Sequence, residues 1–146
     1  MRHVLILPKE IQRNISQERN NDMIDCLIVA AGGAVGAVCR FLAGKLPLSC
    51  GNGFPLKTFL VNIAGCFIIG LIAGLAAKQL SDSPRLVLFM KVGMCGGFTT
   101  FSSFALETGD LIDKGSYFTA CSYMILSISI GVAAVFAAQY LAEKVF

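Results

Sequence analysis

The sequence predicts an all-helical membrane protein with four membrane-spanning helices in one subunit, and two observations lead to this fold class. Hydrophobic residues make up 55% of the 146 residues, charged residues only 14%, and the mean hydropathy is +0.72. Soluble domains usually contain about a quarter charged residues. The apolar residues also fall into four long runs, and a helix needs about 20 residues to cross the hydrocarbon core. Four such spans leave little of the chain for a soluble catalytic domain.

Residues 1–22 form a polar extension that precedes the first apolar run. The basic residues of this extension are Arg2, Lys9, Arg13 and Arg19. The segment lacks the apolar core of a signal peptide. Because Met23 directly precedes the apolar run, residues 1–22 are either a dispensable cytoplasmic extension or the product of a start codon assigned too far upstream. We therefore expect one four-helix transmembrane domain over residues 23–146.

The first two spans are expected at about Cys26–Leu46 and Thr58–Ala77. Both contain small residues at spacings that let a neighbouring helix approach closely. These are Gly32, Gly33 and Gly36 in the first span, and Gly65, Gly70 and Gly74 in the second. The first span contains one charge, Arg40, near its end, and the second contains the polar amide of Asn62. Because an amide against lipid is costly, Asn62 is expected to face protein or water.

The third segment, Leu86 to about Leu111, is expected to be a broken helix. Gly96 and Gly97 are followed by hydroxyl residues in an otherwise apolar stretch, and this composition argues against a continuous helix. The hydroxyl residues are Thr99, Thr100, Ser102 and Ser103. Unwound backbone near Gly96 and Gly97 is tolerated at membrane depth only where it is buried in protein or lines a cavity. The predicted break therefore suggests a transport function.

The fourth span, Ser116–Ala142, contains no charged residue. Thr119, Tyr123 and Ser127 follow one another at four-residue intervals, which places their hydroxyl groups on one face of the helix. This face would line a narrow polar track, with ordinary hydrogen bonds between helices as the alternative interpretation. Gly131 occupies the next position of the same face, where the track is expected to be less polar.

Composition excludes several other classes of function. The net charge of +3 is spread over helix ends and turns, so nucleic-acid binding is not expected. The six cysteines have no CxxC spacing and lie mostly in apolar runs, which indicates neither a metal site nor a disulfide framework. The chain lacks a credible pair of nucleophile and base, so no enzyme is expected.

Two further kinds of membrane protein compete with a channel. A small proton-coupled exporter would need a titratable carboxylate deep in the first spans, and none lies between Cys26 and Ala77. A purely structural membrane protein or assembly factor would explain the glycine packing. It would not explain why Asn62, Tyr123, Ser127 and a broken helix occur together.

Three motifs are specific enough to indicate a family. They are Gly33-Ala-Val-Gly36 with Arg40, then Val61-Asn62-Ile-Ala-Gly65, then Gly96-Gly97-Phe98-Thr99-Thr100-Phe101-Ser102-Ser103-Phe104 with Glu107. In these motifs the chain resembles the Fluc (CrcB) family of fluoride channels. The resemblance covers the chain from Met23 to its C-terminus, in the expected order and spacing.

The resemblance implies a homodimer of four-helix subunits inserted antiparallel, with two narrow fluoride pores in the bilayer of the cell inner (plasma) membrane. It implies passive export of cytoplasmic fluoride, which lowers fluoride toxicity. The pore residues that it implies are Arg40, Thr58, Asn62, Phe101, Phe104, Tyr123 and Ser127. It also implies a structural Na⁺ ion on the dimer axis, held by the backbone carbonyls of Gly96 and Thr99 from both subunits, since oxygen ligands suit a hard cation.

Physical chemistry assigns roles to some of these residues. Fluoride is small and holds its water tightly, so a pore must replace that water with hydrogen-bond donors and positive dipole ends. Asn62 offers two N–H donors, with an interhelical hydrogen bond as the alternative role. Phe101 and Phe104, at i and i+3, point to nearly the same side, and the rim of a phenyl ring is its positive part. Core packing is the commoner role of paired phenylalanines, and only the motif match favours anion-facing rings here.

Two alternative roles are open for each of two charged residues near the pore motifs. Glu107 is expected to be structural or to lie at a pore rim, with Ser103 as a hydrogen-bond donor. Lys57 would either attract anions or extend its ammonium group to the membrane surface.

The basic residues from Met23 onward are divided equally between the two sides of the membrane. One side receives Lys78, Arg85, Lys91 and Lys144, and the other receives Arg40, Lys45, Lys57 and Lys114. A balanced count permits insertion in both orientations, as an antiparallel homodimer requires. The basic residues of the N-terminal extension would upset this balance if they are translated.

Overall fold

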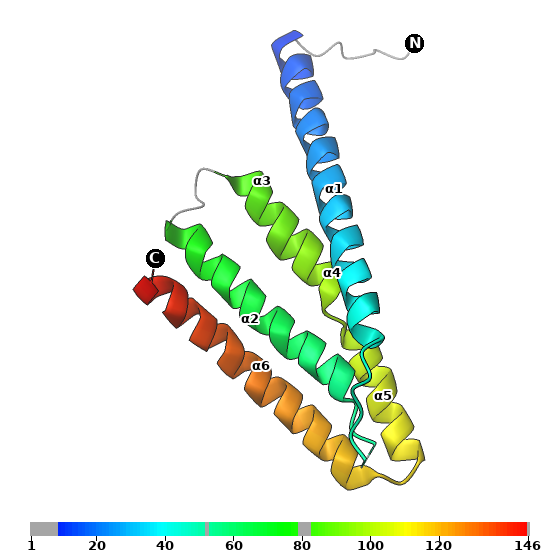
Figure 1. The fold of residues 1–146 in the computed structure, drawn as a ribbon. Helices are drawn as coiled ribbons and strands as arrows, with labels where there is room; N and C mark the ends of the chain where they lie inside the picture. The colour runs from blue at the N-terminus through cyan, green and yellow to red at the C-terminus, as the bar shows by residue number, and fades with distance from the viewer. Residues whose placement is uncertain (1–8, 52, 79–82, 146) are drawn as a thin grey trace, which may run out of the picture.

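The computed structural model describes residues 9–51, 53–78 and 83–145, and its regular elements over these ranges are helices (Figure 1). The elements are α1 (Lys9–Gly44), α2 (Leu56–Lys78), α3 (Pro84–Val87), η1 (Leu88–Cys95), α4 (Gly96–Phe98), α5 (Phe101–Asp113) and α6 (Tyr117–Val145). The turns of η1 are π-helical. The elements α3, η1 and α4 follow one another without interruption and form the first half of the third segment, and α5 forms its second half.

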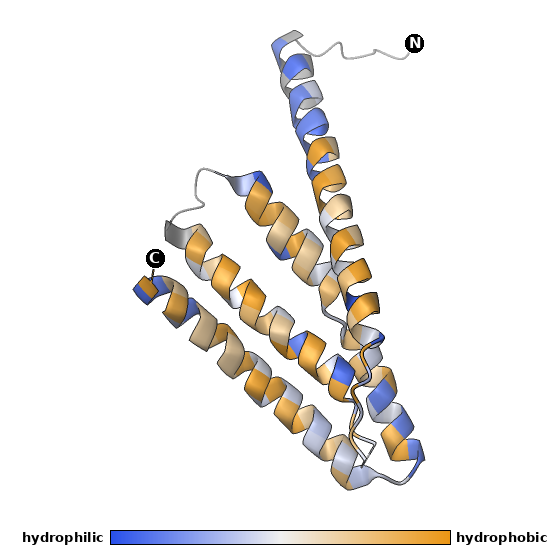
Figure 2. Cartoon of the chain, in the orientation of Figure 1, coloured by the Kyte–Doolittle hydropathy of each residue, from blue (hydrophilic) through white to orange (hydrophobic). Residues whose placement is uncertain are grey.

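Four helical segments in the described part of the chain are long and apolar enough to cross a membrane. They are Ser16–Gly44, Leu56–Ala76, Pro84–Asp113 and Tyr117–Val145. Hydrophobic residues cover most of their length, whereas the N-terminal end of α1 is hydrophilic (Figure 2). The prediction of a four-span, multi-pass membrane protein is therefore confirmed.

Helix α1 is much longer than the span predicted within it. Its 36 residues give a length of about 54 Å, and the hydrocarbon core is only about 30 Å thick. The helix continues without interruption through residues 22 and 23, where the predicted polar extension meets the predicted domain. Its N-terminal end projects beyond the other helices (Figure 1). Residues 1–8 of the predicted extension lie outside the described residues.

Glycines bring the helices together in two pairs, α2 with α6 and α1 with the first half of the third segment (Figure 1). A Cβ atom on Gly70 of α2 would lie 2.6 Å from the carbonyl oxygen of Val135 on α6. A Cβ atom on Gly36 of α1 would lie 2.8 Å from the backbone nitrogen of Phe98 on α4. Close backbone approach at small residues is what the sequence pattern predicts.

The third segment leaves the helical conformation at Thr99 (φ −79°, ψ 157°) and Thr100 (φ −147°, ψ 111°). The break in the helix therefore lies just after Gly96 and Gly97, near which it was predicted, because both glycines belong to helix α4. Gly97 serves close packing instead, since a Cβ atom there would lie 3.0 Å from the Cα atom of Gly33 on α1. The backbone extends where a side chain of α2 takes over its hydrogen bonds, as described below.

Candidate functional site

A groove of about 380 Å³ lies beside the extended residues Thr99 and Thr100. It is lined by α2, by both halves of the third segment and by α6. Four of the predicted pore residues line it, namely Asn62, Phe101, Phe104 and Ser127. Gly96 and Thr99, the predicted Na⁺ ligands, line it as well. The structure thus brings together most of the predicted site from three separate spans.

The side-chain amide of Asn62 replaces the helical hydrogen bonds of Thr100. The Nδ2 group of Asn62 donates to the Thr100 carbonyl oxygen at 3.1 Å, and the Thr100 N–H donates to Asn62 Oδ1 at 2.8 Å. The interhelical hydrogen bond that was the alternative role for Asn62 is therefore present. One N–H of the amide is left without an acceptor among the described residues, so Asn62 retains a donor for a ligand in the groove.

The extended backbone releases carbonyl groups of the first half. In a continuous helix the carbonyl of Gly96 would accept from the N–H of Thr100, which instead donates to Asn62. The carbonyl of Thr99 would accept from the N–H of Ser103, which instead donates to Thr100 Oγ1 at 3.2 Å. The carbonyl of Gly97 accepts from Arg40 Nε at 3.1 Å. Gly96 and Thr99 therefore offer carbonyl oxygens at the groove that have lost their helical donors.

Thr100 also starts the second half of the segment as the N-cap of α5. Its hydroxyl oxygen accepts from the N–H of Ser103, the usual N-cap geometry, and its O–H donates to Ser103 Oγ at 3.0 Å. Sequence reasoning assigned Thr100 no role of its own. A threonine directly before a helix was the available signal for this cap.

The rings of Phe101 and Phe104 lie on the same side of α5, as their spacing predicts. Their centroids are 5.7 Å apart and the ring planes are tilted by 43°. Phe104 also contacts the ring of Tyr123, with centroids 5.0 Å apart. Phe101 is 80% exposed although it is a large apolar residue inside a span. Phe101 is thus a highly exposed residue that also lines the groove.

The carboxylate of Glu107 joins three helices by hydrogen bonds. Its Oε1 accepts from Thr58 Oγ1 of α2 at 2.5 Å, and its Oε2 accepts from the Tyr123 hydroxyl of α6 at 2.8 Å. The expected donor, Ser103, bonds to Thr100 instead. Tyr123 is 0% exposed and packs with Leu111 and Ala120 in the small core. The hydroxyl of Tyr123, a predicted pore donor, is therefore directed to Glu107 within the subunit.

A second, smaller cavity of about 90 Å³ contains two cationic residues, Arg40 and Lys57. The Nζ group of Lys57 donates to the carbonyl of Gly44 at the C-terminal end of α1, where a cation is favourable. Thr58 and Thr100 also line this cavity. Because Thr100 lines the groove too, the hydrogen-bonded pair of Asn62 and Thr100 lies where the two cavities meet.

The hydroxyl stripe of α6 reaches the groove at Ser127. Its Oγ atom is buried and has no hydrogen-bond partner among the described residues. The next position of the stripe, Gly131, packs against α2, since a Cβ atom there would lie 3.3 Å from Cys66 Sγ. Ser127 thus lines the groove and carries a buried hydroxyl without a protein partner in the described chain, and the polar stripe ends there.

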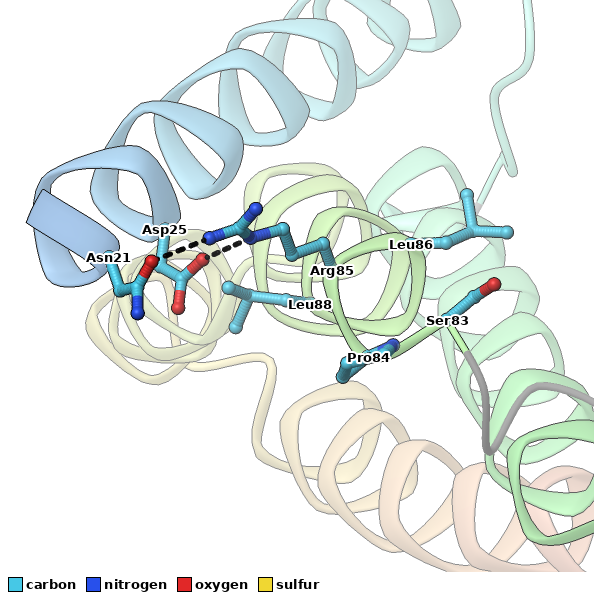
Figure 3. A pocket seen from close by; sticks show the side chains of 7 residues that line it. All are labelled: Asn21, Asp25, Ser83, Pro84, Arg85, Leu86 and Leu88. Atoms are coloured by element: carbon cyan, nitrogen blue, oxygen red, sulfur yellow. Dashed lines mark hydrogen bonds and ion pairs between the residues drawn. The ribbon is translucent and has the colours of Figure 1, made fainter. Parts of the chain in front are cut away.

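A larger, open cavity of about 790 Å³ lies between α1, at Asn21 and Asp25, and the start of α3, and none of the predicted site residues lines it. Figure 3 shows Arg85 reaching from the third segment to two residues of α1. Arg85 Nε lies 3.1 Å from Asp25 Oδ1, and Arg85 Nη2 donates to Asn21 Oδ1 at 3.2 Å. This exposed cluster ties the first half of the third segment to α1.

Comparison with known proteins supports the relationship that the motifs indicate. The family model described as CrcB-like protein, Camphor Resistance (CrcB), matches residues 27–139. A fluoride-specific ion channel FluC of Agrobacterium fabrum is 42% identical over 125 residues, which are 85% of this chain and 100% of that protein. Proteins of the same name from Caulobacter vibrioides and Chlorobium phaeobacteroides are 45% and 43% identical, over 82% and 80% of this chain and 96% and 91% of their own length. The predicted extension, residues 1–22, lies outside the family match.

Proposed function

The chain belongs to the CrcB-like protein family, and from this membership we propose that it is a fluoride channel of the cell inner membrane. It carries fluoride out of the cytoplasm by passive electrodiffusion and so lowers fluoride toxicity. The single observation that carries this proposal is the groove that gathers Asn62, Phe101, Phe104 and Ser127 beside the extended backbone. The relatives named fluoride-specific ion channel, matched over nearly their full length, support it.

The chemistry of the two cavities fits a small anion. Arg40 and Lys57 supply positive charge in the smaller cavity, which raises the local concentration of anions. Asn62 then offers its remaining N–H, and Ser127 offers an O–H that has no partner in the described chain. The positive rims of two phenyl rings complete a wall that replaces the water of fluoride. Chloride is larger, and a narrow passage of this kind excludes it.

We further propose that a second copy of the chain, inserted in the opposite orientation, closes the groove. The exposure of Phe101 at the groove supports this, because one subunit leaves the proposed pathway open on one side. The balanced division of basic residues from Met23 onward also supports it. For a chain that starts at Met23, a C-terminal tag should be accessible from both sides of the membrane. A single orientation of this chain would contradict the antiparallel dimer.

We also propose that the released carbonyls of Gly96 and Thr99 bind a structural Na⁺ ion between the two subunits. Both residues line the groove and both carbonyl oxygens have lost their helical donors, and hard cations prefer such oxygen ligands. Carbonyl oxygens contributed by both subunits would coordinate the ion, and this coordination would hold the two broken segments together. No carboxylate is needed, and within the described residues no group of three His, Cys, Asp or Glu side chains could hold a metal.

The channel is tested by fluoride efflux from liposomes that contain the purified protein, with chloride efflux as the reference. Fast fluoride efflux with little chloride efflux is expected, and absent or equal flux of the two anions would reject the proposal. Asn62→Asp replaces the remaining donor by a carboxylate and should suppress the fluoride flux. Phe101→Ile removes a positive ring rim and should suppress it too. Phe118→Ile is the matched control, because Phe118 is equally exposed but does not line the groove.

A further inference from the structure

The groove contains one charged side chain that the proposed pathway does not use, and this is Lys91 of η1. Lys91 is exposed, and its ammonium group forms no hydrogen bond or ion pair within residues 9–51, 53–78 and 83–145. No acidic residue lines the groove in this part of the chain. The positive charge of Lys91 is therefore not balanced by any group of the groove.

Lys91 lies inside a membrane span, where a charged side chain without a partner is rare. Lys91 lies about midway between Pro84, where the third span begins, and Thr99, where its helical backbone ends. A charged residue inside a span is costly against lipid and normally faces a water-filled cavity or another polar group. The ammonium group must therefore reach the membrane surface, the water of the groove, an anion bound there or a group of the second subunit that is proposed to close the groove.

Lys91 and Gly96 lie about one π-helical turn apart in sequence. The hydrogen bonds of a π-helix join residues i and i+5, so the five residues from Lys91 to Gly96 span one such step. A Cβ atom on Gly96 would have no neighbour within 4 Å, which leaves space beside the backbone at this position. Lys91 and Gly96 both line the groove, together with the unpartnered hydroxyl of Ser127. The residues that carry a cation, a hydroxyl without a partner and two phenyl rings thus line one groove.

The two cationic sites belong to opposite halves of the membrane. Lys57 lies near the start of α2 and Arg40 near the C-terminal end of α1, whereas Lys91 lies in the half of the third segment nearer α3 (Figure 1). We propose that Lys91 is a second anion-attracting residue, which concentrates a small inorganic anion at the mouth of the groove opposite Arg40 and Lys57. In the proposed channel, on whose function this inference rests, that anion is fluoride.

The test compares the fluoride efflux of the wild type, Lys91→Gln, Lys91→Arg and the control Lys144→Gln in liposomes. Lys144 lies near the end of α6, on the same side of the membrane as the start of the third segment, and does not line the groove. At low fluoride and low ionic strength, Lys91→Gln should reduce the initial rate by roughly tenfold, because a fixed charge at a pore mouth raises the arrival rate of the opposite ion. Lys91→Arg and Lys144→Gln should keep the wild-type rate. At high ionic strength the rates of all four proteins should converge, because the Debye length becomes about 3 Å at 1 M salt.

Each other outcome has a definite meaning. If Lys91→Gln matches the wild type at low ionic strength, the ammonium group extends to lipid headgroups and the inference is wrong. If Lys91→Gln and Lys91→Arg reduce the initial rate of fluoride efflux equally, the shape of the side chain matters rather than its charge. That result would also overturn the inference. Failure of Lys91→Gln to assemble, seen by size-exclusion chromatography, would reveal a structural partner of the ammonium group and overturn it as well. A wild type without fluoride flux would instead reject the proposed channel itself.

Discussion

The two halves of the third segment are held in place by different kinds of interaction. The first half, α3 to α4, lies against α1 where glycines let the backbones touch, as Gly36 does with Phe98. The second half, α5, is joined to α2 and α6 by the hydrogen bonds of Glu107 to Thr58 and Tyr123. The proposed site lies where these two halves meet.

This difference indicates what each half can contribute to a pore. Backbone contact at glycines depends on shape alone, so it fixes the distance between helices and leaves few polar groups on them. Hydrogen bonds depend on direction, so Glu107 and its two partners fix the rotation of α5 and hence where Phe101 and Phe104 point. Asn62 joins the two halves through Thr100. Variants that affect one kind of interaction at a time can separate these contributions.

The largest effect is expected from filling a glycine contact of the first half. In Gly36→Ala the new Cβ atom would lie 2.8 Å from the backbone nitrogen of Phe98 and also against the carbonyl of Met94. These atoms are backbone and cannot rotate away, so overpacking should cost about 3 kcal/mol. We expect a large drop in the apparent melting temperature in detergent, measured by circular dichroism, and loss of monodisperse protein.

The matched control for this variant is Gly109→Ala in the second half. A Cβ atom on Gly109 would have no neighbour within 4 Å, and alanine favours a helix over glycine by about 1 kcal/mol. Gly109→Ala should therefore be neutral or slightly stabilising. Equal destabilisation by both variants would mean that glycine contacts do not distinguish the two halves.

A smaller effect is expected from removing the link between the halves in Asn62→Ala. The N–H and the carbonyl of Thr100 would lose their partners in a half-buried place, which should cost about 2 kcal/mol. The apparent melting temperature should fall less than in Gly36→Ala, and slow hydrogen exchange at Thr100 should become fast in mass-spectrometric measurements. Unchanged exchange there would show that Asn62 does not hold the extended backbone.

In the second half, Glu107→Gln should destabilise the protein by about 1 kcal/mol. In glutamine an NH2 group replaces one of the two carboxylate oxygens, so the hydroxyl of either Thr58 or Tyr123 faces a donor instead of an acceptor. The control is Asp110→Asn, because Asp110 is exposed on the same helix and its carboxylate has no hydrogen bond in the described chain. The melting temperatures of the two variants test this prediction, and a Glu107→Gln protein as stable as the control would contradict it.

Much of this arrangement could be predicted from the sequence, and the rest depended on contacts between spans. Hydropathy predicted four spans because bilayer thickness sets the length of each run. Composition predicted a break near Gly96 and Gly97, but it could not show that the glycines stay helical and that the backbone extends at Thr99 and Thr100, where Thr100 bonds to Asn62. The partners of Glu107 were missed for the same reason, since Tyr123 and Thr58 reach it from two other helices. A pattern within one span cannot show which side chain of another span will lie opposite it.

The smallest effect is expected at the outer end of the first half, where an exposed ion pair joins it to α1. Arg85 pairs with Asp25 at 3.1 Å, but their side chains are 50% and 42% exposed, and exposed ion pairs contribute only about 0.2–1 kcal/mol. Asp25→Asn should therefore lower the apparent melting temperature slightly at low salt and not at all at high salt, where screening has already weakened the pair. Arg85 also keeps its hydrogen bond to Asn21 in this variant. A fall in melting temperature as large as that of Gly36→Ala would show that charge at the membrane edge, rather than backbone contact, holds the first half against α1.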